Sequence, residues 1–510
     1  MKKTVFSYFV LTTILLFSVA GLRAQVSTMY YLKNNPYRHQ LNPAFQPASG
    51  FYIDLPLLPS LELSVGNNSL TFGDIIYPKM INGQMKTITF MDENGDKDLF
   101  YNTLKSQTNI QSNLQLDIFS LGFRSRNSYF TFGVSQKFNM NAGLPKDMFK
   151  LMIYGTPDTL NVNRYNMSSL NISSTAYTEY ALGYSREIND RLSVGAKAKW
   201  LVGEANISAG FNKLNMNADR EHWDASIDGT VNGAIPFAKF ILNNAGKIDS
   251  ISSSFPAPNT DKGFGGYMDM VKEFMDVMRH PSGSGFAVDL GAAYKISDKL
   301  SVSASVLDLG FIHWKRNTVN IPVSGNFSFG GIDFNADDST GNFSENLGTI
   351  SDSITYKTTF NPYNTSLQTK ILAGVEYYLV KDKISLGLLS KSTFINKKLV
   401  EEITTSANFF PADWFNASVS YSLMNGRFSN LGLGINTRVG PSNWFLVSDY
   451  IPLRYTPEFI PYKTRSVNLK MGFCLTFGNG KKEKKEKEDK KTNNIEKSPN
   501  IIPDINPVEE

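Results

Sequence analysis

Few residues of this chain have the type and spacing that catalytic or metal chemistry requires. The histidines, His39, His222, His280 and His313, are scattered without ligand spacing, and Cys474 is the single cysteine. There is no phosphate-binding glycine loop, no His-Glu-x-x-His zinc helix and no Gly-x-Ser-x-Gly elbow. The sequence therefore predicts a protein that is not an enzyme and uses no cofactor or metal. A Ser-His or Asp-His site assembled from distant loops is the alternative.

Charged residues recur instead at alternate positions of long extended runs. Successive side chains of a strand point to opposite faces, so each such run has one charged or polar face and one apolar face. These charges could pair with one another, contact an inserted segment or line a conduit. The candidates are Glu179, Lys197, Lys199, Asp289, Glu376 and Lys470.

The run 466–477 shows most clearly which element positions these charges. Every second residue from Val467 to Phe477 is apolar, and small or polar residues, with Lys470, lie between them. About 9–11 residues of a tilted strand cross a bilayer. A Lys or Arg on the lipid face near the midplane costs about 2–4 kcal/mol, which explains why the apolar faces carry none. We interpret this run as the closing strand of an outer-membrane β-barrel.

Similar runs occur along the chain, and a turn of the type Asn189-Asp190-Arg191 recurs at 297–299 and 381–383. Alternating up and down through the runs puts these turns and both termini on one side, which we expect to be periplasmic. The fold class expected is all-β: a transmembrane antiparallel β-barrel of about 14 strands, with an N-terminal plug and short helices in long outer loops. The predicted strands lie near 61–72, 113–123, 128–138, 172–186, 191–204, 285–295, 299–311, 370–379, 383–394, 399–409, 414–424, 428–438, 444–452 and 466–477.

Composition agrees with a barrel. The 510 residues have a mean hydropathy of −0.23, which argues against a bundle of membrane helices, and 13% are aromatic, as interfacial girdles require. An aromatic-rich soluble β protein is the alternative. The net charge of +5 indicates no nucleic-acid partner.

The predicted organisation has four parts. Residues 1–24 have the plan of a signal peptide, 25–60 form the N-terminal plug segment, 61–478 the barrel, and 479–510 a disordered charged periplasmic tail.

The long connections, near 73–112, 139–171, 205–284, 312–369 and 453–465, are expected to be outer loops. Helix-like patterns occur at 144–154 and 267–278. The second could contact a ligand through Met270, Val271, Phe274 and Met278, or could simply pack on the barrel mouth.

The exported chain, the early Leu41-Asn42-Pro43-Ala44, about fourteen strands and the terminal aromatic strand together resemble the outer-membrane fatty-acid-transporter-like superfamily. Within it the chain is most similar to barrels of unknown function, over about residues 28–478. The resemblance implies that Asn42, Pro43 and Ala44 lie in the lumen as part of a plug, and that hydrophobic molecules pass through.

The leading hypothesis is thus an outer-membrane barrel that binds or transports small hydrophobic molecules. Its partners would be outer-membrane lipid, a hydrophobic small molecule and a periplasmic or surface protein. The alternative is a non-conducting scaffold for secretion, surface attachment or partner proteins.

Overall fold

The structure is a computed structural model that describes residues 27–54, 58–157, 159–220, 222–253, 279–329, 354–395, 398–424, 427–451 and 465–478, with isolated residues between 254 and 278. The predicted signal peptide, the charged tail and the helix face of Met270, Val271, Phe274 and Met278 lie outside the described residues.

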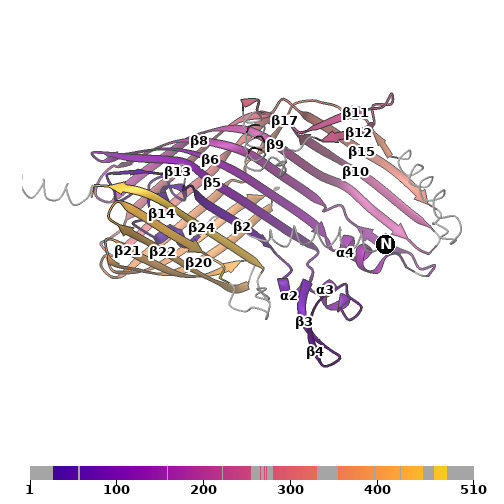
Figure 1. Ribbon diagram of the computed structural model, residues 1–510, viewed down its shortest axis with the longest axis horizontal. Coiled ribbons are helices and arrows are strands. Elements are labelled where there is room, and N and C mark those ends of the chain that lie inside the picture. Colours follow the sequence, from indigo (N-terminus) through magenta and orange to yellow (C-terminus); the bar gives the residue numbers. More distant parts are fainter. Residues whose placement is uncertain are drawn as a thin grey trace, which may run out of the picture.

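The described chain forms a closed antiparallel barrel with fourteen strand positions (Figure 1). β24 (Ser466–Phe477) closes the barrel by pairing with β1 (Phe51–Ile53) and β2 (Ser60–Asn67), which share one position and pair with β5 on their other side. Residues 51–53 therefore belong to the barrel wall, although they were predicted to be part of the N-terminal plug segment, residues 25–60. The other wall strands are β5 (Gln107–Ser125), β6 (Ser128–Pro145), β8 (Asn171–Glu187), β9 (Leu192–Ala218), β13 (Gly283–Lys295), β14 (Leu300–Trp314), β18 (Lys370–Val380) preceded by β17 (Tyr363–Ser366), β19 (Ile384–Ile395), β20 (Lys398–Ala412), β21 (Phe415–Met424), β22 (Arg427–Val439) and β23 (Ser442–Ser448).

The outer surface of this wall is apolar at every strand position. Each position has at least one large apolar side chain that is more than a third exposed, and the six charges selected from the sequence are buried. A closed barrel satisfies its backbone hydrogen bonds without water, and an apolar outer band is the surface that such a barrel presents to lipid. The protein is therefore an outer-membrane-type β-barrel. The exposed residues include Leu63, Phe123, Phe138, Leu182, Trp200, Phe286, Leu309, Val375, Leu386, Phe409, Val419, Leu433, Leu446 and Met471.

Among the described residues, no helix is both long enough and apolar enough to cross a bilayer.

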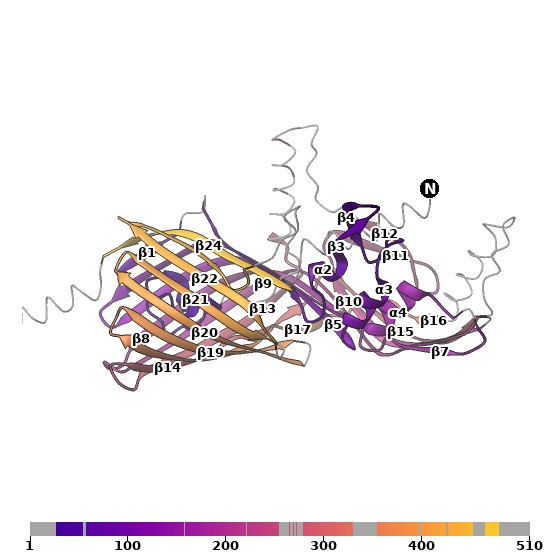
Figure 2. The same ribbon diagram turned by 90° about the horizontal axis from the view of Figure 1, so that it is seen from below.

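One side of the barrel continues well past the length that a bilayer requires (Figure 2). β9 has 27 residues, and its second half pairs with β10 (Trp223–Ala234), which pairs with β15 (Thr318–Phe329). β7 (Asn163–Asn166) and β16 (Ile354–Tyr356) extend this sheet, which we call the extension. The prediction that 205–284 and 312–369 are loops was wrong here. Gly229, Gly233 and Pro322 weaken the alternation of β10 and β15, and β15 pairs with a strand, β10, that is distant in sequence.

The remaining elements lie in the connections. The pattern at 144–154 becomes α4 (Lys146–Tyr154), after β6 has run to Pro145. The first predicted strand ends at Asn67, because Thr71 caps a short helix, α2 (Phe72–Ile75). The other elements are β3 (Ile76–Ile81), β4 (Gln84–Thr89), α3 (Lys97–Thr103), β11 (Ala238–Leu242) and β12 (Ile248–Ser253), with 3₁₀ helices η1 (Ser27–Tyr31) and η2 (Pro36–Gln40).

Candidate functional site: the barrel lumen

Residues 27–50, here called the N-terminal segment, lie inside the barrel and contact strands around its circumference. Thr28 Oγ1 is 2.6 Å from Ser420 Oγ on β21, and Tyr30 OH is 3.0 Å from Ser303 Oγ on β14. On the opposite side, Gln40 donates to Asp117 on β5. The apolar side chains of the segment form the buried core of the lumen, where Met29, Tyr30, Leu32 and Tyr37 are fully buried.

The first residues of this segment are held by one carboxylate. The backbone N–H groups of Ser27 and Thr28 donate to Asp449, at 2.6 and 2.8 Å, and the Thr28 hydroxyl donates to it as well. Asn468 donates to the same carboxylate at 3.0 Å. Charge-assisted hydrogen bonds are about twice as strong as neutral ones, so Asp449 is the main anchor at this end of the segment.

Asn42, Pro43 and Ala44 form a tight turn against the inner wall. Asn42 Oδ1 accepts from the Ala44 N–H at 2.9 Å, and its Nδ2 donates to the carbonyls of Ala292 and Ala304 at 3.3 and 3.1 Å. The wall admits this close approach through two glycines. A Cβ on Gly291 would lie 2.1 Å from Asn42 Oδ1, and one on Gly195 would lie 2.3 Å from the Pro43 carbonyl oxygen.

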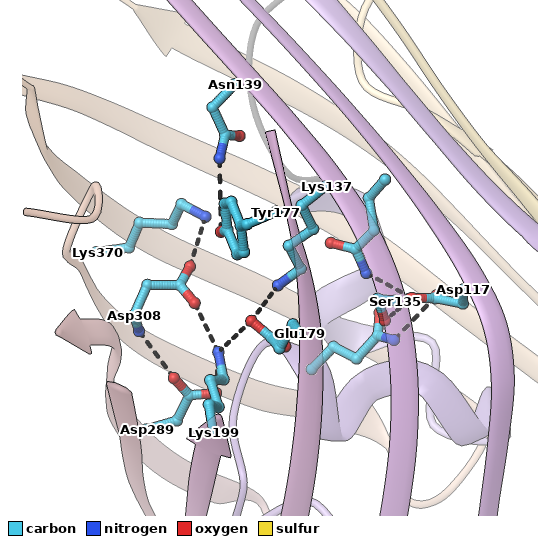
Figure 3. Close-up of polar contacts among 12 residues, drawn as sticks. Asp117, Ser135, Lys137, Asn139, Tyr177, Glu179, Lys199, Asp289, Asp308 and Lys370 are labelled. Atoms are coloured by element: carbon cyan, nitrogen blue, oxygen red, sulfur yellow. Dashed lines mark hydrogen bonds and ion pairs between the residues drawn. The ribbon is translucent and has the colours of Figure 1, made fainter. Parts of the chain in front are cut away.

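Figure 3 shows an ion-pair network on the inner face of β6, β8, β9, β13, β14 and β18. At its centre, Lys199 Nζ lies 2.8 Å from Asp289, 2.6 Å from Asp308 and 3.6 Å from Glu179. Glu179 also accepts from Lys137 at 2.7 Å, and Asp308 from Lys370 at 3.0 Å. All members except Lys370 are at least nine-tenths buried. Each of these charged side chains therefore needs its partners, since an unpaired buried charge is strongly unfavourable.

A β-bulge brings Asp308 into this network. The pairing of β13 with β14 shifts between Val288 and Leu290, and Asp308 has a φ of 58°. Two residues of β14 then face one of β13, so that Leu307 and Asp308 are both buried. The backbone N–H of Asp308 donates to Asp289 Oδ1 at 2.7 Å.

The structure places all six sequence-selected charges on the inner face, and each is less than a tenth exposed. It brings Glu179, Lys199 and Asp289 together. Lys470 lies apart from them, paired with Glu62 at 2.8 Å, and Glu376 accepts from Tyr378 and Ser385.

Several other buried charges of the lumen were not predicted from the sequence. Lys391 and Glu402 are paired at 2.8 Å. Strand register alone would reveal this pair and Glu62–Lys470, because both are directly opposed across neighbouring strands. Lys137 follows the alternation of its own strand. The alternation of β14 does not predict that Asp308 faces the lumen, because the bulge reverses the direction of its side chain.

A cavity of about 60 Å³ opens between this network and the long-connection end of the barrel. Here it is called the mouth cavity. Its lining is mixed. The charged residues are Lys137, Lys370 and Lys391 with Glu62, Asp308 and Glu402, and Leu114, Leu367, Ile395 and Val400 supply apolar side chains. Ser27 Oγ contacts both Lys391 and Glu402, so the N-terminal segment begins directly beside this cavity.

Comparison with known proteins gives one family and a set of distant structures. The model of DUF5723, described as a family of unknown function, matches residues 43–449. No curated protein matches the sequence.

Among solved structures, the Ralstonia pickettii toluene transporter TbuX is 9% identical with a TM-score of 0.39, over 87% of this chain and 94% of that one. The P. putida toluene transporter TodX is 9% identical with a TM-score of 0.36, over 87% and 93%. A Pseudomonas aeruginosa FadL homologue is 9% identical with a TM-score of 0.39, over 90% and 100%. At these identities and TM-scores the likenesses carry no argument for this chain.

Proposed function

The chain belongs to the DUF5723 family, whose function is unknown, and from the lumen geometry we propose that it is a plugged outer-membrane conduit for small molecules. The observation that carries this proposal is that the N-terminal segment fills the core of the lumen and, through Ser27 Oγ, contacts two residues that line the mouth cavity, Lys391 and Glu402. In this proposal residues 27–50 are the plug, with Asn42, Pro43 and Ala44 as its wall contact. The end with the short turns, such as 126–127 and 381–383, faces the periplasm.

The dimensions of the cavity mean that the plug must move for passage. About 60 Å³ holds several water molecules, whereas pockets for drug-sized ligands measure about 300–1,000 Å³. The plug contacts the wall through side chains and backbone groups that can exchange for water. A solute that displaces these contacts can therefore open a path without unfolding the wall.

The lining of the mouth cavity favours a narrower substrate class than the one expected from the sequence: hydrophobic molecules that also carry a polar group. Leu114, Leu367, Ile395 and Val400 can contact an apolar body. The ammonium groups of Lys370 and Lys391 can bind an anionic head, because charge-assisted hydrogen bonds to carboxylates are strong. We therefore propose amphipathic carboxylates as the substrate class.

A reversible disulfide between plug and wall tests this function. Thr28 Oγ1 and Ser420 Oγ are 2.6 Å apart, so Thr28→Cys with Ser420→Cys can form a disulfide in a Cys474→Ser background. In lipid vesicles, uptake of a fluorescent medium-chain carboxylate is expected to stop in the oxidised protein and to return on reduction. The Thr28→Cys single variant is the matched control and should not respond to reductant. Equal uptake by the oxidised and reduced double variant would refute the plug, and no uptake by the wild type would refute transport.

The second candidate is a non-conducting scaffold for partner proteins. The extension favours the scaffold, because its strands project beyond the barrel and expose apolar side chains that a partner could cover. Ile207 is exposed on β9, and Ile241 and Ile251 are exposed on the β11–β12 hairpin. In the vesicle experiment this candidate predicts no uptake with or without reductant.

A further inference from the structure

Lys197 is a buried charge that stands outside the network of Figure 3. It lies on β9 with 6% of its surface exposed. Within the part of the chain that the structure describes, its amine has no hydrogen bond or ion pair. The directly opposed carboxylate, Asp289, is already engaged, since Lys199 binds Oδ2 and the Asp308 N–H binds Oδ1. An ammonium held here without a partner would cost several kcal/mol, so a compensating group is expected.

A second unpartnered donor from the N-terminal segment lies beside it. His39 Nε2 is 2.7 Å from Tyr52 OH, which is itself 2.9 Å from Ser120 Oγ. If Ser120 donates to Tyr52 and Tyr52 donates to Nε2, the proton of the neutral ring resides on Nδ1. His39 Nδ1 is buried and has no hydrogen-bond partner in the described structure.

Both donors line the same small cavities. Lys197 and His39 border one cavity of about 30 Å³ and a second of about 10 Å³, between the N-terminal segment and the inner wall. The lining of the larger cavity also contains charges of both signs, which are Lys137, Lys199, Asp117, Glu179 and Asp289. Gly183 on β8 leaves room for the Lys197 stem, because an added Cβ would lie 3.1 Å from Lys197 Cγ. The larger cavity has the size of a few water molecules or one small ion.

We propose that Lys197 Nζ and His39 Nδ1 form a binding subsite for a small monovalent anion, either a halide or the carboxylate of a small acid. The anion would neutralise Lys197 and connect the wall to the N-terminal segment. This subsite does not depend on transport, because binding can be measured on the full chain in detergent.

The test combines bromide diffraction with anion-dependent stability. Crystals grown in bromide are expected to show an anomalous peak at hydrogen-bonding distance from Lys197 Nζ. The thermal midpoint of the wild type should be higher in chloride or formate than in gluconate at equal ionic strength, because gluconate is too large for the cavity and a ligand of the folded state stabilises it. The chloride and formate arms separate a halide from a carboxylate ligand.

Lys197→Met should lose this anion dependence entirely, His39→Gln should lose part of it, and Lys213→Met, an exposed lysine on the same strand, should retain it. Absence of the bromide peak together with a wild-type midpoint that ignores the anion would overturn the subsite, since Lys197 would then be neutral or hydrated. Anion dependence that persists in Lys197→Met would also overturn it.

Discussion

Lys199 is the residue whose removal should most disturb the lumen. Its ammonium has three carboxylate partners, but they depend on it unequally. In Lys199→Met, Glu179 keeps Lys137 and Asp308 keeps Lys370. Asp289 loses its only ion pair among the described residues, and it is 1% exposed.

The magnitude follows from this orphaned carboxylate. Removing one partner of a buried pair costs about 3–5 kcal/mol, because the other charge stays buried without compensation. The unfolding equilibrium constant should then rise roughly a hundredfold to several thousandfold, since each 1.4 kcal/mol is a factor of ten. Adding Asp289→Asn removes the orphaned charge but keeps an oxygen to accept from the Asp308 N–H. The double variant should therefore recover a large part of the loss.

The assay is reversible urea unfolding of the barrel in lipid vesicles, which gives a free energy for each variant. Lys381→Met is the matched control, because its pair with Asp298 at 3.2 Å is exposed and exposed pairs contribute little. A Lys199→Met protein within about 1 kcal/mol of the wild type would refute the reasoning. So would a double variant no more stable than Lys199→Met.

Three further predictions concern the segment and the lipid face. Gly291→Val should displace Asn42 from the wall and expose the N-terminal segment to limited proteolysis. Gly133→Val should not, because its added Cβ has no neighbour nearer than 3.8 Å. Equal cleavage of the two variants would contradict the contact between Asn42 and Gly291. Asp449→Ala should destabilise the start of the segment by about 1.5–3 kcal/mol per charged hydrogen bond lost, and hydrogen exchange at the Ser27 and Thr28 amides should accelerate; unchanged protection would exclude Asp449 as the anchor. Leu290→Arg, on the outer face of β13, should lower the free energy of unfolding in vesicles by up to about 2–4 kcal/mol. Ile251→Arg in the β11–β12 hairpin should leave this free energy nearly unchanged. An unchanged free energy of unfolding in Leu290→Arg would argue against lipid contact at this position.

The alternation of side chains is the property that the sequence carried most directly. A period of two places Lys199 and Trp200 on opposite faces whatever the strands around them do. Lys199 is buried and Trp200 is 57% exposed, and the same holds around the barrel. Because the short turns also have local signatures, the number of wall strands followed from the sequence.

Tertiary structure alone decided which charges meet and where the sheet continues. Lys197 is directly opposed to Asp289, yet Lys199 binds that carboxylate, because the bulge at Asp308 collects acidic groups around Lys199. β10 follows β9 after a short connection and pairs with its second half, whereas β15 forms only because it finds β10 as a partner far away in sequence. The sequence by itself determined the two faces of each strand, since that is a local property of the backbone. The partners of Lys199, the position of residues 27–50 in the lumen and the pairing of β15 with β10 depend on contacts between distant segments, which no local pattern encodes.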